Sequence, residues 1–215
     1  MKEIYTTVKS QAEAEIVEKR SRFIATVKPV QTEEEALEFL NMLKQKYWNA
    51  THNVYAYIIE ENSIMRYSDD GEPGGTAGLP VLDMLKKSGL TNLIVVVTRY
   101  FGGVLLGTGG LVHAYSKSAK AGVDAAGILD MVLCREIKIE CEYTNLGKLQ
   151  NELSKWENVI KEEPEYSDKV IMPVYVPVSK AENFSSAIVD KMNAQVNIEK
   201  GEKLYHGRER NAFVT

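Results

Sequence analysis

Long apolar runs, an export signal and paired cysteines are all missing from this chain of 215 residues. No apolar run approaches the length that crosses a bilayer, and the N-terminus Met1-Lys-Glu-Ile-Tyr lacks an apolar signal core. The two cysteines, Cys134 and Cys141, lie in one predicted strand at positions that point to opposite faces, so a disulfide between them is implausible. We therefore expect a cytoplasmic protein with free thiols and no membrane association.

An excess of positive charge and a cluster of metal ligands are missing as well. Lys and Arg number 26 against 30 Asp and Glu, a formal net charge of −4, which argues against nucleic-acid binding over the whole surface but leaves room for a local basic patch. Two cysteines and three scattered histidines do not make a structural zinc site. We expect no metal and no cofactor.

No nucleophile–base pair stands out either. Ser116 and Ser118 fall in a predicted helix without a strained elbow, and neither cysteine is placed for reactivity. No catalytic residue is predicted, and a role other than an enzyme is favoured.

The most informative stretch that is present spans residues 93–110. An apolar run over residues 93–97 predicts a strand buried on both faces, and Arg99 follows its C-terminal end beside Tyr100 and Phe101. Five glycines then occur within nine residues, just before a predicted helix. The rest of the first half alternates strand and helix patterns, which predicts a mixed sheet with helices against it.

The second half has a cleaner pattern. Alternating polar and apolar residues over 137–143 predict a strand with one wet face, and the order that follows is helix, strand, strand, helix, strand. Pro173 and Pro177 mark the strand over residues 170–178 as an edge, and Ser179 with Glu182 predicts a capping box. The whole chain is predicted to be α+β, with domains at 1–133 and 134–215, the second a ferredoxin-like βαββαβ domain.

Asp69, Asp70 and Glu72 place three carboxylates on one glycine-rich loop. One interpretation is a magnesium or polar-ligand site, because closely spaced carboxylates collect hard cations. The other, more common, is a solvated turn whose Asp side chains cap backbone N–H groups. Residue types alone leave both open.

The loops over 72–78 and 102–110 each open a helix and can hold an anion on free N–H groups. Neither matches a P-loop or a dinucleotide fingerprint. Arg99 either meets a phosphate, carboxylate or nucleobase, or is a buried structural residue paired with Asp69, Asp70 or a loop carbonyl. His113 and Lys117 lie with Lys120 on the polar stripe of the following helix, which is a solvated face or half of a basic groove.

The segments Tyr67-Ser-Asp-Asp-Gly-Glu-Pro-Gly-Gly-Thr-Ala-Gly78, residues 90–103 and residues 106–115 closely resemble the YigZ/IMPACT family, and the resemblance covers the entire chain. It implies an N-terminal domain like domain IV of elongation factor G and domain 2 of a ribosomal protein, and a C-terminal domain like domain V of that factor. Eukaryotic relatives regulate translation with the help of an additional RWD domain, which we do not expect here.

The resemblance favours one shared binding site over three independent turns. Its expected residues are Asp69, Asp70, Glu72, Arg99, Tyr100, Gly102, Gly103, Gly109, Gly110, His113 and Lys117. The favoured hypothesis is a translation-associated regulatory protein that binds RNA, the ribosome or a translation-regulatory protein. The alternative is a phosphate-ligand or nucleotide-binding protein or enzyme that uses the glycine-rich and acidic loops.

Overall fold

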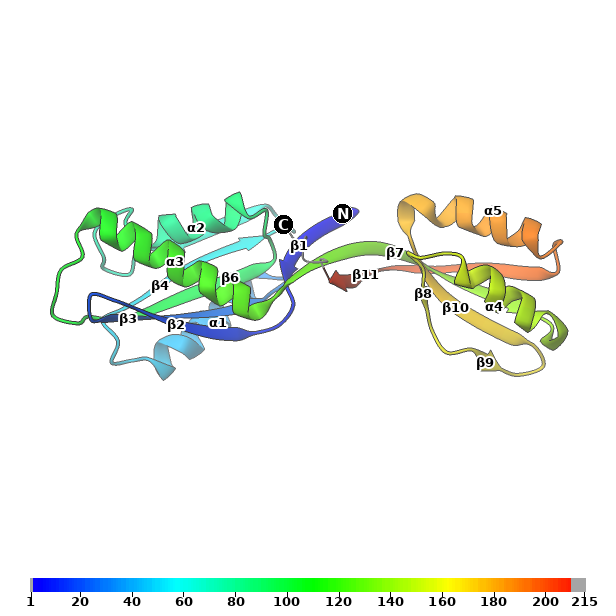
Figure 1. Cartoon of the computed structure of the whole chain (residues 1–215), viewed down its shortest axis with the longest axis horizontal. Helices are drawn as coiled ribbons and strands as arrows, with labels where there is room; N and C mark the ends of the chain where they lie inside the picture. The colour runs from blue at the N-terminus through cyan, green and yellow to red at the C-terminus, as the bar shows by residue number, and fades with distance from the viewer. Residues whose placement is uncertain (1, 210–215) are drawn as a thin grey trace. The chain divides into compact units, whose positions relative to one another are not determined.

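The computed structural model describes residues 2–209, which form an α+β protein with two sheets. The chain divides into two compact units: Tyr5–Asp130 together with Glu209, here the N-terminal unit, and residues 2–4 together with Met131–Arg208, here the C-terminal unit (Figure 1). Within the described range, no helix is both long enough and apolar enough to cross a membrane.

The N-terminal unit is built on an antiparallel sheet with the strand order β2-β3-β6-β4-β5. Its strands are β2 (Ala12–Glu18), β3 (Ser21–Pro29), β4 (His52–Ile59), β5 (Ile64–Ser68) and β6 (Leu93–Tyr100), and β1 (Ile4–Val8) bridges Leu90 through Thr6. The two-residue turn between β2 and β3 has positive φ at both Lys19 and Arg20, which matches the twist of a tight hairpin. This hairpin places Ser21 and Arg20 at the end of the sheet where β6 finishes.

Helices cover both faces of this sheet. α1 (Glu33–Lys46) packs on one face, and α2 (Gly78–Lys87) and α3 (Thr108–Ala126) pack on the other (Figure 1). On β6, Val95 and Val97 belong to the core under α2 and α3, Ile94 and Val96 to the core under α1, and all are fully buried. The prediction of a strand buried on both faces is confirmed, and the alternation sends Arg99 to the side of α2 and α3.

The C-terminal unit contains most of a second sheet, whose strand order is β1-β7-β10-β8; β11 also pairs with β7, and β9 also pairs with β10. Its elements are β7 (Ile128–Cys141), α4 (Leu146–Ser154), β8 (Ile160–Lys161), β9 (Glu165–Tyr166), β10 (Val170–Pro177), α5 (Ala181–Lys191) and β11 (Val196–Glu209). Leu149 of α4 and Phe184 of α5 share one core with Ile139 and Val174 of the sheet. Both cysteines are buried and free.

The prediction that residues 170–178 form an edge strand is wrong. β10 pairs with β7 along one side and with β8 and β9 along the other. β8 pairs with Val174 and Tyr175, and β9 with Val170 and Ile171, so Pro173 lies between the two short segments. An internal strand tolerates a proline here because the ladder on that side is interrupted at the proline.

Two further local predictions at the C-terminal end are wrong. Ser179 lies inside a short 3-10 helix, Val178–Lys180, and no side chain caps α5. The sequence also predicts a basic C-terminal tail with Lys203, His206, Arg208 and Arg210, but the final strand extends from Val196 to Glu209, so Lys203 and Arg208 lie in a strand. Arg210, counted with that tail, lies outside the described residues.

Candidate functional site

A buried ion pair joins Glu72, on the loop between β5 and α2, to Arg99 near the end of β6. Nη1 of Arg99 donates to Oε1 of Glu72 at 2.5 Å, and the two side chains are only 6% and 4% exposed. The hydroxyl of Tyr115 on α3 donates to the same carboxylate oxygen at 2.7 Å, and Nη2 of Arg99 donates to Oγ of Ser21 at 3.3 Å. Burial, and then the hydrogen bond to Glu72, raise the pKa of Tyr115 far above its ordinary value, so the phenol keeps its proton.

Arg99 is held inside the strand, not beyond its end as the sequence pattern indicated. β6 continues to Tyr100, and Arg99 stands opposite Phe23 of β3 and His52 of β4. Its guanidinium carbon lies 5.3 Å from the ring centre of Phe23 and 5.6 Å from that of Phe101. The expected aromatic packing is present, but its partners are these two rings; Tyr100 instead donates its hydroxyl to Asn49 at 3.1 Å.

His52 is a member of this site that residue types did not single out. Its Nδ1 lies 2.8 Å from the carbonyl oxygen of Asp70, which can only accept, so we assign the proton to Nδ1. Its Nε2 lies 3.8 Å from Oε1 of Glu72. Sequence alone showed only a polar residue at the start of a strand; its position opposite Arg99 comes from strand pairing.

Asp69 and Asp70 organise the loop from within. The carboxylate of Asp69 accepts from the backbone N–H groups of Gly75, Ala77 and Gly78 at 2.9, 3.0 and 2.8 Å, which ties down the start of α2. The carboxylate of Asp70 accepts from the N–H of Asn53 at 2.6 Å and from Lys44 at 3.3 Å. This arrangement matches the capping interpretation. In residues 2–209 no group of three or more His, Cys, Asp or Glu side chains is arranged to hold a metal ion.

The glycine turn after β6 permits a close backbone contact and then starts α3. A Cβ atom on Gly102 would lie 2.1 Å from the carbonyl carbon of Arg20, so only glycine fits beneath the β2–β3 hairpin. The N–H of Gly102 donates to Oγ of Ser21 at 3.2 Å. Gly107, with φ of 77°, precedes α3, whose first turn contains Gly109 and Gly110 but no acidic residue and no side-chain cap.

These elements enclose a cavity of about 410 Å³, here called the β6–α3 cavity. Its polar lining comes from Thr51, His52, Glu72, Arg99 and Thr108, and the rest from Pro73, Phe101, Leu105, Leu106, Gly107 and Leu111. The cavity therefore joins a charged cluster, the start of a long helix and an apolar wall.

The predicted site residues separate into three groups. Glu72 and Arg99 line the cavity, and Gly109 and Gly110 begin the helix beside it. Asp69, Asp70, Tyr100, Gly102 and Gly103 support the surrounding backbone without lining it. His113 and Lys117 are exposed on the outer stripe of α3, away from its buried face. In the sequence, Tyr115 shares an apolar helical stripe with Leu111, Ala119 and Val123, which predicts only core packing, yet its hydroxyl joins the site through Glu72.

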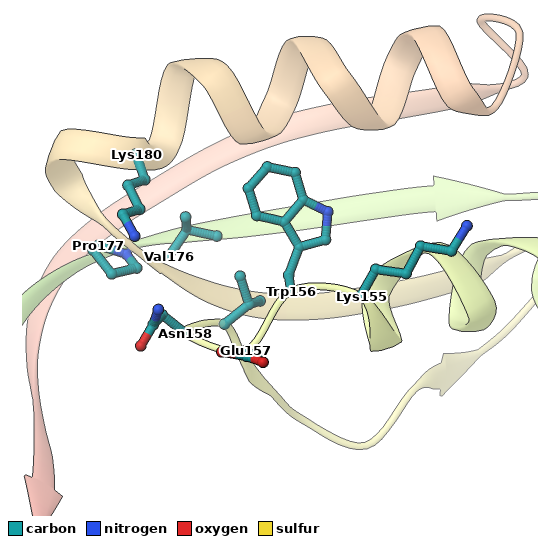
Figure 2. A pocket seen from close by; sticks show the side chains of 8 residues that line it. Lys155, Trp156, Glu157, Asn158, Val176, Pro177 and Lys180 are labelled. Carbon is teal, nitrogen blue, oxygen red and sulfur yellow. The ribbon is translucent and has the colours of Figure 1, made fainter.

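The C-terminal unit has a smaller cavity, of about 180 Å³, near the segment that leads from α4 into β8. Figure 2 shows the side chains of Lys155, Trp156 and Lys180 around it, with Val176 and Pro177 of β10. The indole of Trp156 packs edge-on against Phe184, with ring centres 4.9 Å apart, which anchors this wall in the core. Nothing in its lining forms a nucleophile–base pair.

Two different protein families match the two halves of the chain. The Impact N-terminal domain family matches residues 19–123, and a family described as a domain of unknown function, DUF1949, matches residues 139–195. The chain is 45% identical over 202 residues to the IMPACT family member YvyE of Bacillus subtilis, covering 94% of this chain and 93% of that protein. It is 33% identical over 175 residues to the IMPACT family member YigZ of Escherichia coli, covering 80% and 85%.

A solved structure is also similar over almost the full length. It is described as the crystal structure of a hypothetical protein, and it superposes with a TM-score of 0.59 at 28% identity, covering 94% of this chain and 99% of that one.

Proposed function

The chain belongs to the IMPACT family, and from that membership we propose that it is a translation-associated regulatory protein that binds a protein partner through its N-terminal unit. Two arguments support the proposal. The sequence resemblance implies that eukaryotic relatives regulate translation, and an exposed apolar surface lies beside the β6–α3 cavity. The same reasoning favours a cytoplasmic location.

The observation that carries the proposal is an exposed apolar rim on the cavity. Phe101, Val104 and Leu105, here called the apolar rim, are 47%, 38% and 83% exposed within five consecutive positions. Soluble proteins seldom leave large apolar side chains grouped on the surface unless they meet another surface. The turn after α1, which contains the exposed Trp48, is bonded to the same end of β6 through Thr51, whose N–H donates to the carbonyl of Arg99 at 2.9 Å.

Charge favours a protein partner over RNA. Several basic side chains of the N-terminal unit are already engaged: Arg99 with Glu72, Lys44 with Asp70, and Arg22 with Glu15. An RNA interface needs several cations that are free to contact phosphates. An apolar rim around a largely neutralised charged cluster is better suited to protein side chains.

The proposal is tested by comparing two serine substitutions in a pull-down from native lysate, read by proteomics and RNA sequencing. Leu105→Ser alters the rim, and Leu37→Ser alters an exposed leucine on α1, which packs on the other face of the sheet. We expect a ribosomal or translation-regulatory protein to be captured by wild type and by Leu37→Ser, and to be lost with Leu105→Ser. If the chain instead captures RNA, if that capture weakens as salt is added, and if Leu105→Ser captures as much RNA as wild type, RNA binding replaces this proposal.

We also propose the finer fold assignments. The strand order β11-β7-β10-β8 with two helices supports a ferredoxin-like domain over residues 134–215. The likeness of residues 1–133 to domain IV of elongation factor G rests on the family resemblance. A structural superposition onto each of those domains tests both assignments.

Ligand binding by itself is the second candidate function, and the β6–α3 cavity favours it. A thermal-shift screen of nucleotides and phosphate compounds tests it, because a ligand that binds only the folded chain raises the melting temperature.

A further inference from the structure

We propose that the β6–α3 cavity binds a carboxylate attached to an apolar body, with the carboxylate at the start of α3 and beside Arg99. This inference deepens the proposed function, on which it rests, by naming the chemical group that is recognised at that site. The acid can belong to the end of a partner chain or to a free small molecule.

The start of α3 supplies donors that no other group uses. Thr108, Gly109 and Gly110 form the first helical turn, and no acceptor for their N–H groups is found among residues 2–209. α3 is 19 residues long and has no acidic residue in its first turn, so its positive end is uncompensated. Gly107 and Thr108 both line the cavity, which places this end at its wall.

Arg99 is the second, independent sign of a missing acceptor. It lines the cavity with its side chain only 6% exposed, and its Nε is covered from solvent without a hydrogen-bond partner in the part of the chain described. An unpaired donor on a buried guanidinium is costly, and a carboxylate is the group that guanidinium geometry fits best. Nη1 and Nη2 each use one N–H, toward Glu72 and Ser21, so each keeps a second N–H, and the N–H of Nε has no partner.

The charge balance of the cavity favours a carboxylate over a phosphate. Arg99 is paired with Glu72, so the lining has little net positive charge beyond the helix end. A phosphate with about two negative charges would face Glu72 without enough compensation. A single negative charge is matched by the helix end and the free guanidinium edge.

The remaining lining defines the rest of the ligand. Leu105, Leu106, Leu111 and Phe101 form the apolar part of the cavity, and Leu105 is 83% exposed. Covering these side chains removes apolar surface from water, which an alkyl chain or an apolar residue achieves. The two parts of the lining together specify an acid group next to an apolar group.

The test follows backbone amide signals by NMR while hexanoate is added to the full chain. Hexanol is the uncharged control ligand, and inorganic phosphate is the competing anion. Gly109→Asp places a carboxylate of the chain's own at the helix start, and Gly109→Asn is its neutral control; a Cβ on Gly109 meets no atom within 4 Å, so both variants should fold.

We expect hexanoate to shift the amide signals of Thr108, Gly109 and Gly110, and Gly109→Asp to weaken its binding about tenfold. Gly109→Asn adds a side chain of the same size without the charge and should weaken hexanoate binding much less than Gly109→Asp, and hexanol should not shift these signals. The inference is overturned if phosphate binds more tightly than hexanoate, if hexanol shifts the same signals equally, or if hexanoate shifts none of them.

Two peptides separate the possible sources of the acid. A short peptide that ends in a free leucine carboxylate, compared with the same peptide as its amide, represents the end of a partner chain. Preference for the acid peptide assigns the site to a protein terminus, and binding of hexanoate alone assigns it to a small acid; both support carboxylate recognition. If Leu105→Ser abolishes partner capture while hexanoate does not bind wild type, the proposed function stands and this inference fails.

Discussion

Arg99 and Glu72 lie 27 positions apart in the chain, and their side chains meet in an ion pair that is almost completely removed from water. Strand β6 fixes the first residue and the loop before α2 fixes the second. The hydroxyl of Tyr115 adds a hydrogen bond from a third element, α3. The pair therefore links the three segments that enclose the β6–α3 cavity.

Removing the charge of Glu72 should destabilise the N-terminal unit strongly. Glu72→Gln leaves the Arg99 guanidinium buried without its counter-ion, which costs about 3–5 kcal/mol of unfolding free energy. Urea unfolding followed by circular dichroism measures the change. The control is Glu15→Gln, which breaks the exposed pair with Arg22 and should have a much smaller effect. Equal losses in the two variants would show that burial does not strengthen the Arg99 pair.

Tyr115→Phe should lower stability at neutral pH by about 1.5–3 kcal/mol, because Glu72 loses a donor in a buried site. The folded-state pKa of Tyr115 is raised by burial and by Glu72, so the stabilisation is complete below about pH 10, the ordinary tyrosine value, and is lost as the pH rises beyond it. The difference between wild type and variant should therefore shrink from pH 8 to pH 10.5 in urea unfolding. A difference that grows over this range would contradict the assignment.

Asp69→Ala should destabilise the chain by about 2 kcal/mol, because three backbone N–H groups lose their acceptor. Magnesium chloride should leave the melting temperature of wild type unchanged relative to sodium chloride of equal ionic strength. A magnesium-dependent rise that disappears in Asp69→Ala would restore the cation site.

Gly102→Ala and Gly109→Ala should act in opposite directions. The added methyl group on Gly102 overlaps the backbone of Arg20 and should cost about 1–3 kcal/mol. On Gly109 the methyl group meets open space inside a helix and should stabilise by up to about 1 kcal/mol. Urea unfolding of the two variants checks both signs, and stabilisation by Gly102→Ala would disprove the close contact.

Both cysteines should react slowly with a thiol reagent in the native protein. Burial raises the pKa of the Cys134 thiol. Burial is also the largest cause of the raised pKa of the Cys141 thiol, so little thiolate of either residue exists at neutral pH. An absorbance assay with an aromatic disulfide should detect two thiols only after denaturation. Rapid native reaction of either one would reveal an exposed thiolate.

Local patterns predicted the elements well because their causes are local. The unbroken apolar run of β6 was enough to indicate burial on both faces. The spacing of Thr32 and Glu35 predicts a capping box, and Thr32 caps α1 by accepting from the N–H of Glu35 at 3.2 Å. The predictions failed where the pairing between strands decides whether a strand lies at the edge or inside the sheet. Pro173 is tolerated inside the sheet because it lies between the segments paired with β8 and β9, where its carbonyl accepts from the N–H of Glu162 at 3.1 Å and no N–H is needed from the proline.

The sequence by itself determined the α+β class, the family and the residues of the signature loops, because spacing and motif identity suffice for these. As structural partners of Arg99 it offered Asp69, Asp70 or a loop carbonyl, which is wrong because the partner is Glu72, and it gave no reason to include His52 or Tyr115. Only the tertiary structure decided these questions, since strand register and helix packing bring together residues that are far apart in the chain. The same packing turns Asp69 toward backbone N–H groups and leaves Arg99 with an unpaired donor at a cavity.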